Sequence, residues 1–207
     1  MRVAISQPEH FPYLGFFQKM TRADLFVLLD DVQFSGRGTF QNRNRLVESD
    51  GTTHWFTVPV AKGSYMRRLD QVQVSPDDGW RGKLLRRLHY HFGQDFGAAY
   101  EPSRLCEINI RSIKLLRQAL DINVPMIRSS SLSCSGAKSE RLAQICEAVG
   151  GDTYLCGSGG ASYIDLRVFR KISVEYFHEQ VPDYLSTLCH LSPKQLARGL
   201  SSLARST

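Results

Sequence analysis

Short apolar runs alternate with helical patterns over much of the chain. The runs fall at residues 2–6, 25–30, 126–129, 153–156 and 173–177. Strand-like runs that alternate with helices are typical of a parallel sheet built from right-handed crossovers. We therefore predict an α/β fold with a doubly wound, mostly parallel five-stranded sheet, its strands ordered 3-2-1-4-5 or similar.

Residues 45–122 interrupt this alternation. Residues 50–74 contain strand-like runs and predict a small antiparallel hairpin. Helical patterns with apolar residues on one face cover residues 80–92 and 103–119 inside the interruption, and residues 14–21, 138–149 and 192–203 outside it. We predict a single α/β domain, residues 1–207, that carries a β-hairpin and a helical lobe inserted at residues 45–122.

Polar loops follow the predicted strands. They lie at residues 7–13, 30–44, 129–136 and 157–163. Parallel strands deliver their carboxyl ends to one edge of a sheet, where doubly wound folds bind ligands. This convergence predicts a small-molecule site.

Three residues at this edge are the catalytic candidates. His10, beside Glu9 in the first loop, is the histidine best placed for acid–base chemistry, and the alternative is a histidine hydrogen-bonded inside a tight turn. Asp30 and Asp31 end an apolar strand and suit binding of a substrate amine, sugar hydroxyls or Mg²⁺. Their alternative is to cap a loop.

Substrate-binding candidates come from all four loops. Glycine amides after a strand can approach a phosphate or carboxylate closely, and serines with an arginine at a helix start can hold an anion or simply cap the helix. The candidates are Gln7, Tyr13, Gln33, Arg43, Asn44, Ser131, Ser135, Arg141, Gly157, Ser158, Gly159, Gly160 and Tyr163. The glycine run lacks the spacing of the known nucleotide fingerprints.

The chain is basic, with a net charge of +6 and a pI of about 9.2. Much of the excess is clustered around Arg37, Arg67 and Arg81. Basic surfaces attract phosphate groups, whether of a nucleotide, a coenzyme or a nucleic acid. A solvated arginine-rich surface is the alternative interpretation of each cluster.

Composition excludes several classes of protein. Five cysteines, an odd number without a CxxC pair, disfavour a disulfide framework and a structural zinc site, and we predict no metal centre. No apolar run approaches the roughly 20 residues of a membrane helix. The chain opens on a core strand rather than a signal segment, so we expect a cytoplasmic protein with no membrane partner.

Several motifs together resemble the WbqC-like protein family of bacteria. They read QPxxFPxxGFF from Gln7, ADxFVxxDDVQF from Ala23, NRN from Asn42, WxTVPV from Trp55, SxRL from Ser139, YLxGxGG from Tyr154 and YxD from Tyr163. The resemblance spans residues 3–184. It implies a cytoplasmic bacterial protein from clusters that make surface polysaccharide or specialised metabolites, and the context of these clusters suggests acyl, aminoacyl or other group transfer.

A fainter likeness concerns the nucleotidylyltransferase and pantothenate synthetase superfamily, which implies a Rossmann-like fold. That superfamily has a Pro-x-His-x-Gly-His loop before a helix. Here Pro12 and Gly15 are kept, but Tyr13 and Phe16 stand where the histidines would lie. Aromatic rings cannot donate to phosphate as imidazoles do, so the likeness supports the fold more than adenylyl transfer.

We expect a transferase or ligase that moves an acyl, aminoacyl or similar group onto an amine. Its small-molecule substrate would be phosphorylated, nucleotide-bearing or amino-acid-derived. The cofactor is left open, with a nucleotide or Mg²⁺ as the two candidates. A nucleotidylyltransferase-like enzyme is one alternative. Another is a non-catalytic scaffold that holds pathway enzymes or tRNA, which we favour less because the arginines do not alternate with aromatic residues in the sequence.

Overall fold

A computed structural model describes residues 1–36, 38–48, 50–77, 79–160 and 162–205. The chain divides into two compact units, each built from segments far apart in sequence. The first unit contains Met1–Gln7, Gly15–Asp31 and Val124–Pro182, and the second contains Pro8–Leu14, Val32–Asn123 and Asp183–Thr207. Arg37, placed by its sequence in a basic cluster, lies outside the described residues.

The first unit holds the parallel sheet. Its strands are β1 (Arg2–Ser6), β2 (Leu25–Leu28), β5 (Met126–Arg128), β6 (Thr153–Gly157) and β7 (Ser173–Phe177). They are ordered β5-β2-β1-β6-β7 and every neighbouring pair is parallel. The predicted doubly wound α/β fold and its strand order are confirmed.

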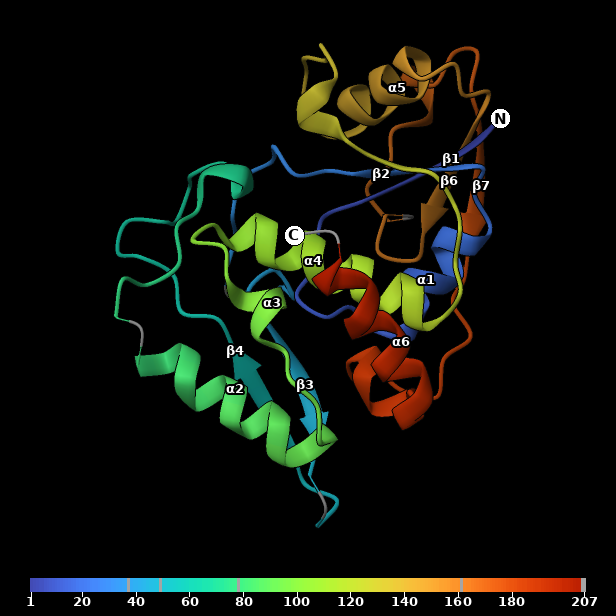
Figure 1. Ribbon diagram of the computed structural model, residues 1–207. Coiled ribbons are helices and arrows are strands. Elements are labelled where there is room, and N and C mark those ends of the chain that lie inside the picture. The colour runs from blue at the N-terminus through green and yellow to red at the C-terminus, as the bar shows by residue number, and fades with distance from the viewer. Residues whose placement is uncertain (37, 49, 78, 161, 206–207) are drawn as a thin grey trace. The chain divides into compact units, whose positions relative to one another are not determined.

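Helices cover both faces of this sheet (Figure 1). On one face, Val3 and Ile5 of β1 pack with Ala143 of α5 (Lys138–Ala148). On the other, α1 (Leu14–Thr21) brings the ring of Phe16 to 5.1 Å from the ring of Phe26. Because side chains alternate along β1 and β2, these strands contribute to an apolar layer on each face of the sheet. Each fully buried large apolar side chain stabilises the fold by about 1.5–3 kcal/mol.

The second unit combines an antiparallel hairpin with helices. The hairpin is β3 (Arg43–Val47) with β4 (Thr53–Thr57), and the helices are α2 (Gly79–Phe92), α3 (Gly97–Tyr100), α4 (Leu105–Ala119) and α6 (Pro193–Ala204). Helices α4 and α6 pack closely, since a side chain at Gly199 would lie 2.5 Å from the carbonyl oxygen of Leu115. Short 3₁₀ turns cover Leu69–Gln71, Ser129–Ser131, Leu166–Val168 and Thr187–His190.

The hairpin differs from the sequence-based expectation. Residues 43–45 were expected to lie in a loop, and residues 50–74 to pair among themselves, but β4 pairs with β3. Val60 and Val74 form only an isolated bridge. The reason is Asn44, a polar residue at an inward-facing position, which hides the alternation of the strand.

No helix in the described part of the chain is long and apolar enough to cross a membrane.

Candidate functional site

The carboxyl ends of β1 and β6 mark the point where the sheet changes direction. From the central β1, the chain continues to β2 and β5 on one side, whereas β6 and β7 lie on the other side. Doubly wound sheets bind ligands outside the strand ends at this switch point. In the first unit, Gln7 follows β1, and residues 158–160 follow β6.

Lys19 of α1 lies at this switch point. Its side chain is buried, and its Nζ donates to the carbonyl oxygen of Ile5 (2.7 Å) and to Oγ of Ser6 (3.1 Å), both at the end of β1. A side-chain carbon at Gly157 would lie 3.6 Å from the same Nζ. A buried ammonium group therefore sits beside the ends of both central strands.

Sequence reasoning missed Lys19. A single lysine in a short helix reads as a solvated charge. The available signal was its place in the helix, because positions 16, 19 and 20 share a face and the other two are apolar. A lysine within an apolar stripe points to an internal role for its charge.

Asp30 lies at the same edge and is fully buried. Its Oδ1 accepts from the backbone N–H of Ser130 (2.9 Å), and the Oγ of Ser129 lies 3.1 Å from the same oxygen. Its Oδ2 accepts from Nε of Arg128 (2.5 Å) and from Oγ of Ser130 (2.7 Å). Three donors from Arg128 and Ser130 thus bind this carboxylate and tie the end of β2 to the end of β5.

The surroundings of Asp30 keep it ionised. Burial alone would raise the pKa of this carboxyl group, but the hydrogen bonds from Ser130 and the guanidinium of Arg128 together outweigh burial, and the pKa lies below its ordinary value. An ionised, fully hydrogen-bonded carboxylate is a positioning group rather than a base. Its role in catalysis stays a prediction.

Asp31 forms a second pair with Arg141 of α5. Arg141 Nη2 donates to Oδ2 of Asp31, and Ser129 Oγ donates to Oδ1 at 2.6 Å. Nη1 of Arg141 also donates to the carbonyl oxygen of Cys134 at 2.6 Å. The two neighbouring carboxylates are therefore matched by two guanidinium groups, and a Mg²⁺ ion would have to displace these to bind directly.

The serines that follow β5 hydrogen-bond within their loop and to α5, and neither Ser131 nor Ser135 caps that helix. Ser131 Oγ donates to the carbonyl oxygen of Arg128 (2.7 Å), and Ser135 is bonded to Oε1 of Gln144 (2.9 Å from its N–H). Helix α5 begins after Ala137, without a side-chain cap. Both serines are exposed, and anion binding by either stays a prediction.

The glycine loop forms a compact turn. The N–H of Gly160 donates to the carbonyl oxygen of Gly157 (2.9 Å), and that of Tyr163 to the carbonyl oxygen of Gly160 (3.2 Å). Ser158 Oγ donates to Oε1 of Glu179 at 2.8 Å, whereas Gly159 and the ring of Tyr163 are exposed. Some of these N–H groups thus serve the turn itself, and ligand binding by this loop stays a prediction.

His10 belongs to the second unit, where it is fully buried. Its Nε2 lies 3.2 Å from the hydroxyl of Tyr100, and its ring lies 4.9 Å from the ring of Phe56. Burial lowers the pKa of His10 to about 3, against a smaller raising effect of Asn109. These features favour the second interpretation of His10, a histidine held by hydrogen bonds inside the protein.

The remaining candidates of the second unit are spread over its surface and interior. Asn44 is buried and donates to the carbonyl oxygens of His10 (3.2 Å) and Phe11 (2.8 Å), so that it holds the loop of residues 8–14. Gln33 is exposed and bridges to Arg68, and Tyr13 bridges to Ser186. Substrate contacts by these residues, and by Arg43 on β3, stay predictions.

Among the described residues of both units, no group of three or more His, Cys, Asp or Glu side chains is arranged to hold a metal ion. A cavity of about 520 Å³ is lined by α1, β7 and the start of β1, with Arg2, Arg22, Gln18 and Gln180 among its polar residues. None of the candidates from the sequence lines it.

Comparison with known proteins agrees with the motifs in the sequence. The WbqC-like protein family matches residues 7–189. The chain is also 30% identical, over 186 residues, to the uncharacterized protein Rv1507c of Mycobacterium tuberculosis (strain ATCC 25618 / H37Rv), which covers 84% of this chain and 79% of that protein. No solved structure gives a significant match. The chain belongs to the WbqC-like protein family.

Proposed function

We propose that this WbqC-like protein is a group-transfer enzyme of bacterial biosynthesis, a cytoplasmic transferase or ligase that moves an acyl, aminoacyl or similar small group onto an amine. The carboxyl edge of its parallel sheet binds the anionic part of the donor, a phosphate or a carboxylate. The observation that carries the proposal is the buried ammonium of Lys19 at the switch point, beside Ser6 and Gly157. A cation in this place suits an anionic ligand.

The reaction would form a C–N bond. The amine nitrogen attacks the carbonyl carbon of the donor, the bond from this carbon to the leaving group breaks, and the leaving group departs with the electron pair while the nitrogen loses a proton to water. Negative charge grows on the carbonyl oxygen and on the leaving group. A fixed ammonium group stabilises such charge better than mobile water does.

The paired carboxylates support this edge. The Asp30–Arg128 and Asp31–Arg141 pairs hold the ends of β2, β5 and α5 in one arrangement. Because these charges are already matched, they add rigidity without attracting a competing ion. Rigid surroundings are what a positioned transfer reaction needs.

A matched set of variants tests the proposal. Thermal-shift titrations with coenzyme A, ATP, CTP, dTDP-sugars and amino acids identify the donor class, because a ligand of the folded state raises the melting temperature. Incubation with candidate amines, followed by mass spectrometry, then detects the transferred group. Lys19→Met should weaken binding at least tenfold and abolish the product, and Lys19→Arg should keep part of both. Arg170→Ala, which removes an exposed charge of the first unit, should keep both in full.

A non-catalytic binding protein is the second candidate. The specific observation in its favour is that both oxygens of Asp30 already accept hydrogen bonds and that His10, with a pKa of about 3, is a poor base at neutral pH. It predicts the same thermal shifts and the same loss in Lys19→Met, but no transfer product with any amine. Absence of product from a tightly bound donor would therefore reject the enzyme and keep the binding site.

A further inference from the structure

The β3–β4 hairpin of the second unit presents two unlike faces. Asn44, Leu46 and Phe56 point inward and are buried. On the other face Arg45 lies directly opposite Trp55 in the register, and Arg43 lies two residues before Arg45. Since side chains alternate along a strand, the two arginines and the tryptophan share the outer face.

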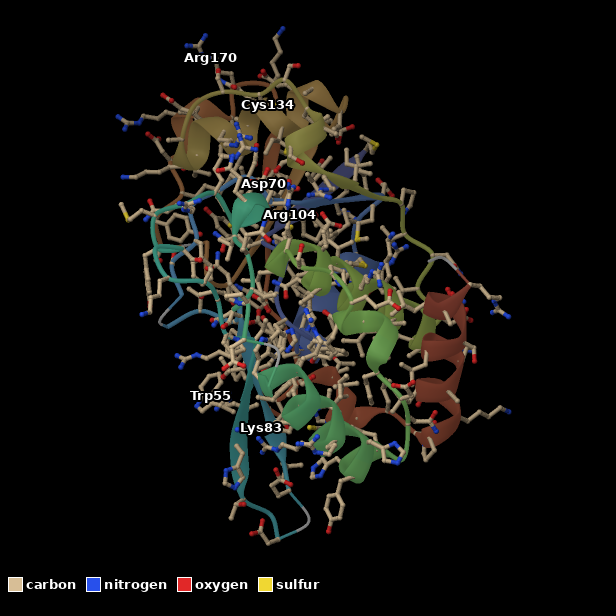
Figure 2. The ribbon with its side chains drawn as sticks, turned by 60° about the vertical axis from the view of Figure 1, so that its left-hand side comes forward. Trp55, Asp70, Lys83, Arg104, Cys134 and Arg170 are labelled. Carbon is tan, nitrogen blue, oxygen red and sulfur yellow. The ribbon has the colours of Figure 1, made fainter. Side chains whose placement is uncertain are left out.

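Trp55 and the arginines form one stacked group. The guanidinium carbon of Arg43 lies 4.3 Å from the centre of the Trp55 ring, and that of Arg45 lies 5.7 Å from it. Trp55, labelled in Figure 2, is nevertheless 44% exposed. The hairpin thus presents a cationic and aromatic group that is partly exposed to solvent.

Further rings continue this surface. The ring of Phe40 lies 6.2 Å from Trp55, that of Tyr13 lies 6.5 Å from Phe40, and that of Tyr184 lies 5.2 Å from Tyr13. Tyr184 is 49% exposed. Segments from three distant parts of the chain, all within the second unit, therefore build a row of aromatic rings edged by arginines, which we name the aromatic–arginine row.

Within the part of the chain that the structure describes, no carboxylate neutralises the arginines of this row. Arg68, Arg87 and Arg111 each pair with a carboxylate. Among the described residues, neither Arg43 nor Arg45 has a carboxylate within ion-pairing distance. The Nε of Arg43 is covered and lacks a hydrogen-bond partner there, so this guanidinium is held by ring contact.

We propose that the aromatic–arginine row binds an unpaired stretch of RNA. Bases of single strands stack on aromatic rings and on guanidinium planes, and arginines contact the phosphates between them. RNA is the polynucleotide that presents unpaired bases at its loops and ends. The net charge of +6 adds a long-range attraction for such a strand. The sequence argued against a nucleic acid because its arginines and aromatic residues are not interleaved, but the hairpin register and the loops interleave them in space.

This proposal is independent of the anion site in the first unit. Lys19→Met should leave RNA binding unchanged, and the variants below should leave binding of the small donor unchanged. The failure of one proposal therefore does not imply the failure of the other.

Two readouts test it. The first is the fluorescence anisotropy of a labelled 12-nucleotide RNA without secondary structure, titrated with the full chain at several salt concentrations. The second is tryptophan emission in a Trp80→Phe variant, which leaves Trp55 as its single tryptophan. We expect the RNA to quench Trp55, because a base stacks beside it.

Matched variants locate the contact. Trp55→Ala should weaken RNA binding at least tenfold, within the range of base–aromatic stacking. Arg43→Gln should reduce the slope of log K against log salt by about 0.7, the contribution of one single-strand phosphate contact. Tyr90→Ala, which removes an 84% exposed aromatic ring of α2, and Arg170→Ala, which removes a charge of the first unit, should change neither.

Several outcomes would overturn the proposal. If Trp55→Ala and the unaltered protein bind the RNA with equal affinity, the aromatic–arginine row is not the RNA-binding site. Equal binding of duplex RNA, or tighter binding of single-stranded DNA of the same sequence, would indicate a general polyanion surface or another ligand. Self-association lost in Trp55→Ala, without RNA binding, would assign the row to a protein interface.

Discussion

Three buried titratable side chains give the sharpest predictions at the scale of single residues. His10, Asp30 and Lys19 are all buried, yet they differ in how the fold treats their charge. His10 is kept neutral among aromatic rings, whereas Asp30 is kept ionised by hydrogen bonds from Ser130 and Arg128. Removal of a buried polar group or of its partner has large costs, so these residues give sharp predictions.

His10 should make stability depend on pH. The pKa of His10 is lowered from 6.5 to about 3 in the folded protein. Between pH 6.5 and pH 3, therefore, His10 is protonated in the unfolded chain but neutral in the folded protein. The free energy of unfolding should therefore fall by about 1.4 kcal/mol for each pH unit as the pH drops below 6.5. Urea unfolding at pH 7, 6, 5 and 4 measures it.

His10→Gln, which cannot take up a proton, should flatten this slope. His89→Gln, an exposed histidine of α2, is the control and should leave the slope in place. An unaltered slope in His10→Gln would show that another group causes the acid sensitivity.

The Asp30–Arg128 pair should show strong coupling. Asp30→Asn removes the charge of a fully buried carboxylate from the guanidinium of Arg128, whose side chain is 36% exposed, and should cost about 1–3 kcal/mol of unfolding free energy. The double variant Asp30→Asn/Arg128→Met should lose less unfolding free energy than the sum of the losses in the two single variants.

Asp165→Asn offers a comparison in the same unit, because Asp165 pairs with the 90% exposed Arg167, and exposed ion pairs contribute little to stability, so this variant should cost much less. Denaturant unfolding of all variants gives the comparison. Equal, small losses for Asp30→Asn and Asp165→Asn would contradict the picture of a saturated internal network.

The sequence located part of this edge of the first unit and missed the rest for physical reasons. Asp30 and Asp31 were found because two carboxylates ending an apolar run are unusual. Their partners Arg128 and Ser129 were not, because pairing across the sheet depends on the register of β2 with β5, which no local pattern encodes. Lys19 was overlooked because one charge on a short helix has no periodic signature.

At the scale of elements, a close backbone contact at Gly199 sets the distance between helices α4 and α6. Gly199 of α6 faces α4, where an added side-chain carbon would lie 2.5 Å from the carbonyl oxygen of Leu115 and 3.2 Å from Cβ of Ala119. Glycine is costly within a helix, so its presence here reflects the contact between the helices. The distance between α4 and α6 is thus fixed by a residue without a side chain.

Gly199→Ala should destabilise the protein by about 1–3 kcal/mol, although alanine is the better helix former. The clash with a backbone carbonyl cannot be relieved by a side-chain rotation. Ser201→Ala, an exposed position of the same helix, should be neutral or slightly stabilising in the same urea titration. A more stable Gly199→Ala variant would mean that α4 and α6 are farther apart than described.

Helices and strands were predictable where the hydrophobic periodicity of the sequence matches the burial of the side chains in the structure. The strands of the parallel sheet are short apolar runs and were found with their order, and α1 was found with its bounds. Strand β3 was not found, because Arg43 and Arg45 face outward while the inward Asn44 is polar, so that the run reads as a polar loop. Helix α3 spans only Gly97–Tyr100, too short for any helical period to show.

Discontinuous segments build both units at the scale of the whole molecule. The second unit draws Asp183–Thr207 from the C-terminal end of the chain, and this segment supplies α6, whose Leu196 and Leu203 are buried. The same segment supplies Tyr184 to the aromatic–arginine row. Neither unit is a contiguous stretch that could be cut out of the chain.

Truncation after Pro182 should therefore damage the second unit. We expect weaker near-ultraviolet circular dichroism, binding of a hydrophobic dye and a lower melting temperature, because α4 loses the apolar cover of α6. Leu196→Ala in the full chain should show a milder loss of about 2–5 kcal/mol. A truncated chain with the spectrum and melting temperature of the full protein would contradict this organisation.

The affinity of the protein for its anionic donor, compared between the unaltered chain and Lys19→Met, tests the central claim most directly. Isothermal titration calorimetry with the ligand that gives the largest thermal shift measures it. We predict an affinity at least tenfold weaker in Lys19→Met, with partial recovery in Lys19→Arg and no change in Arg170→Ala. An unchanged affinity in a folded Lys19→Met protein would contradict an anion site at the switch point of the sheet.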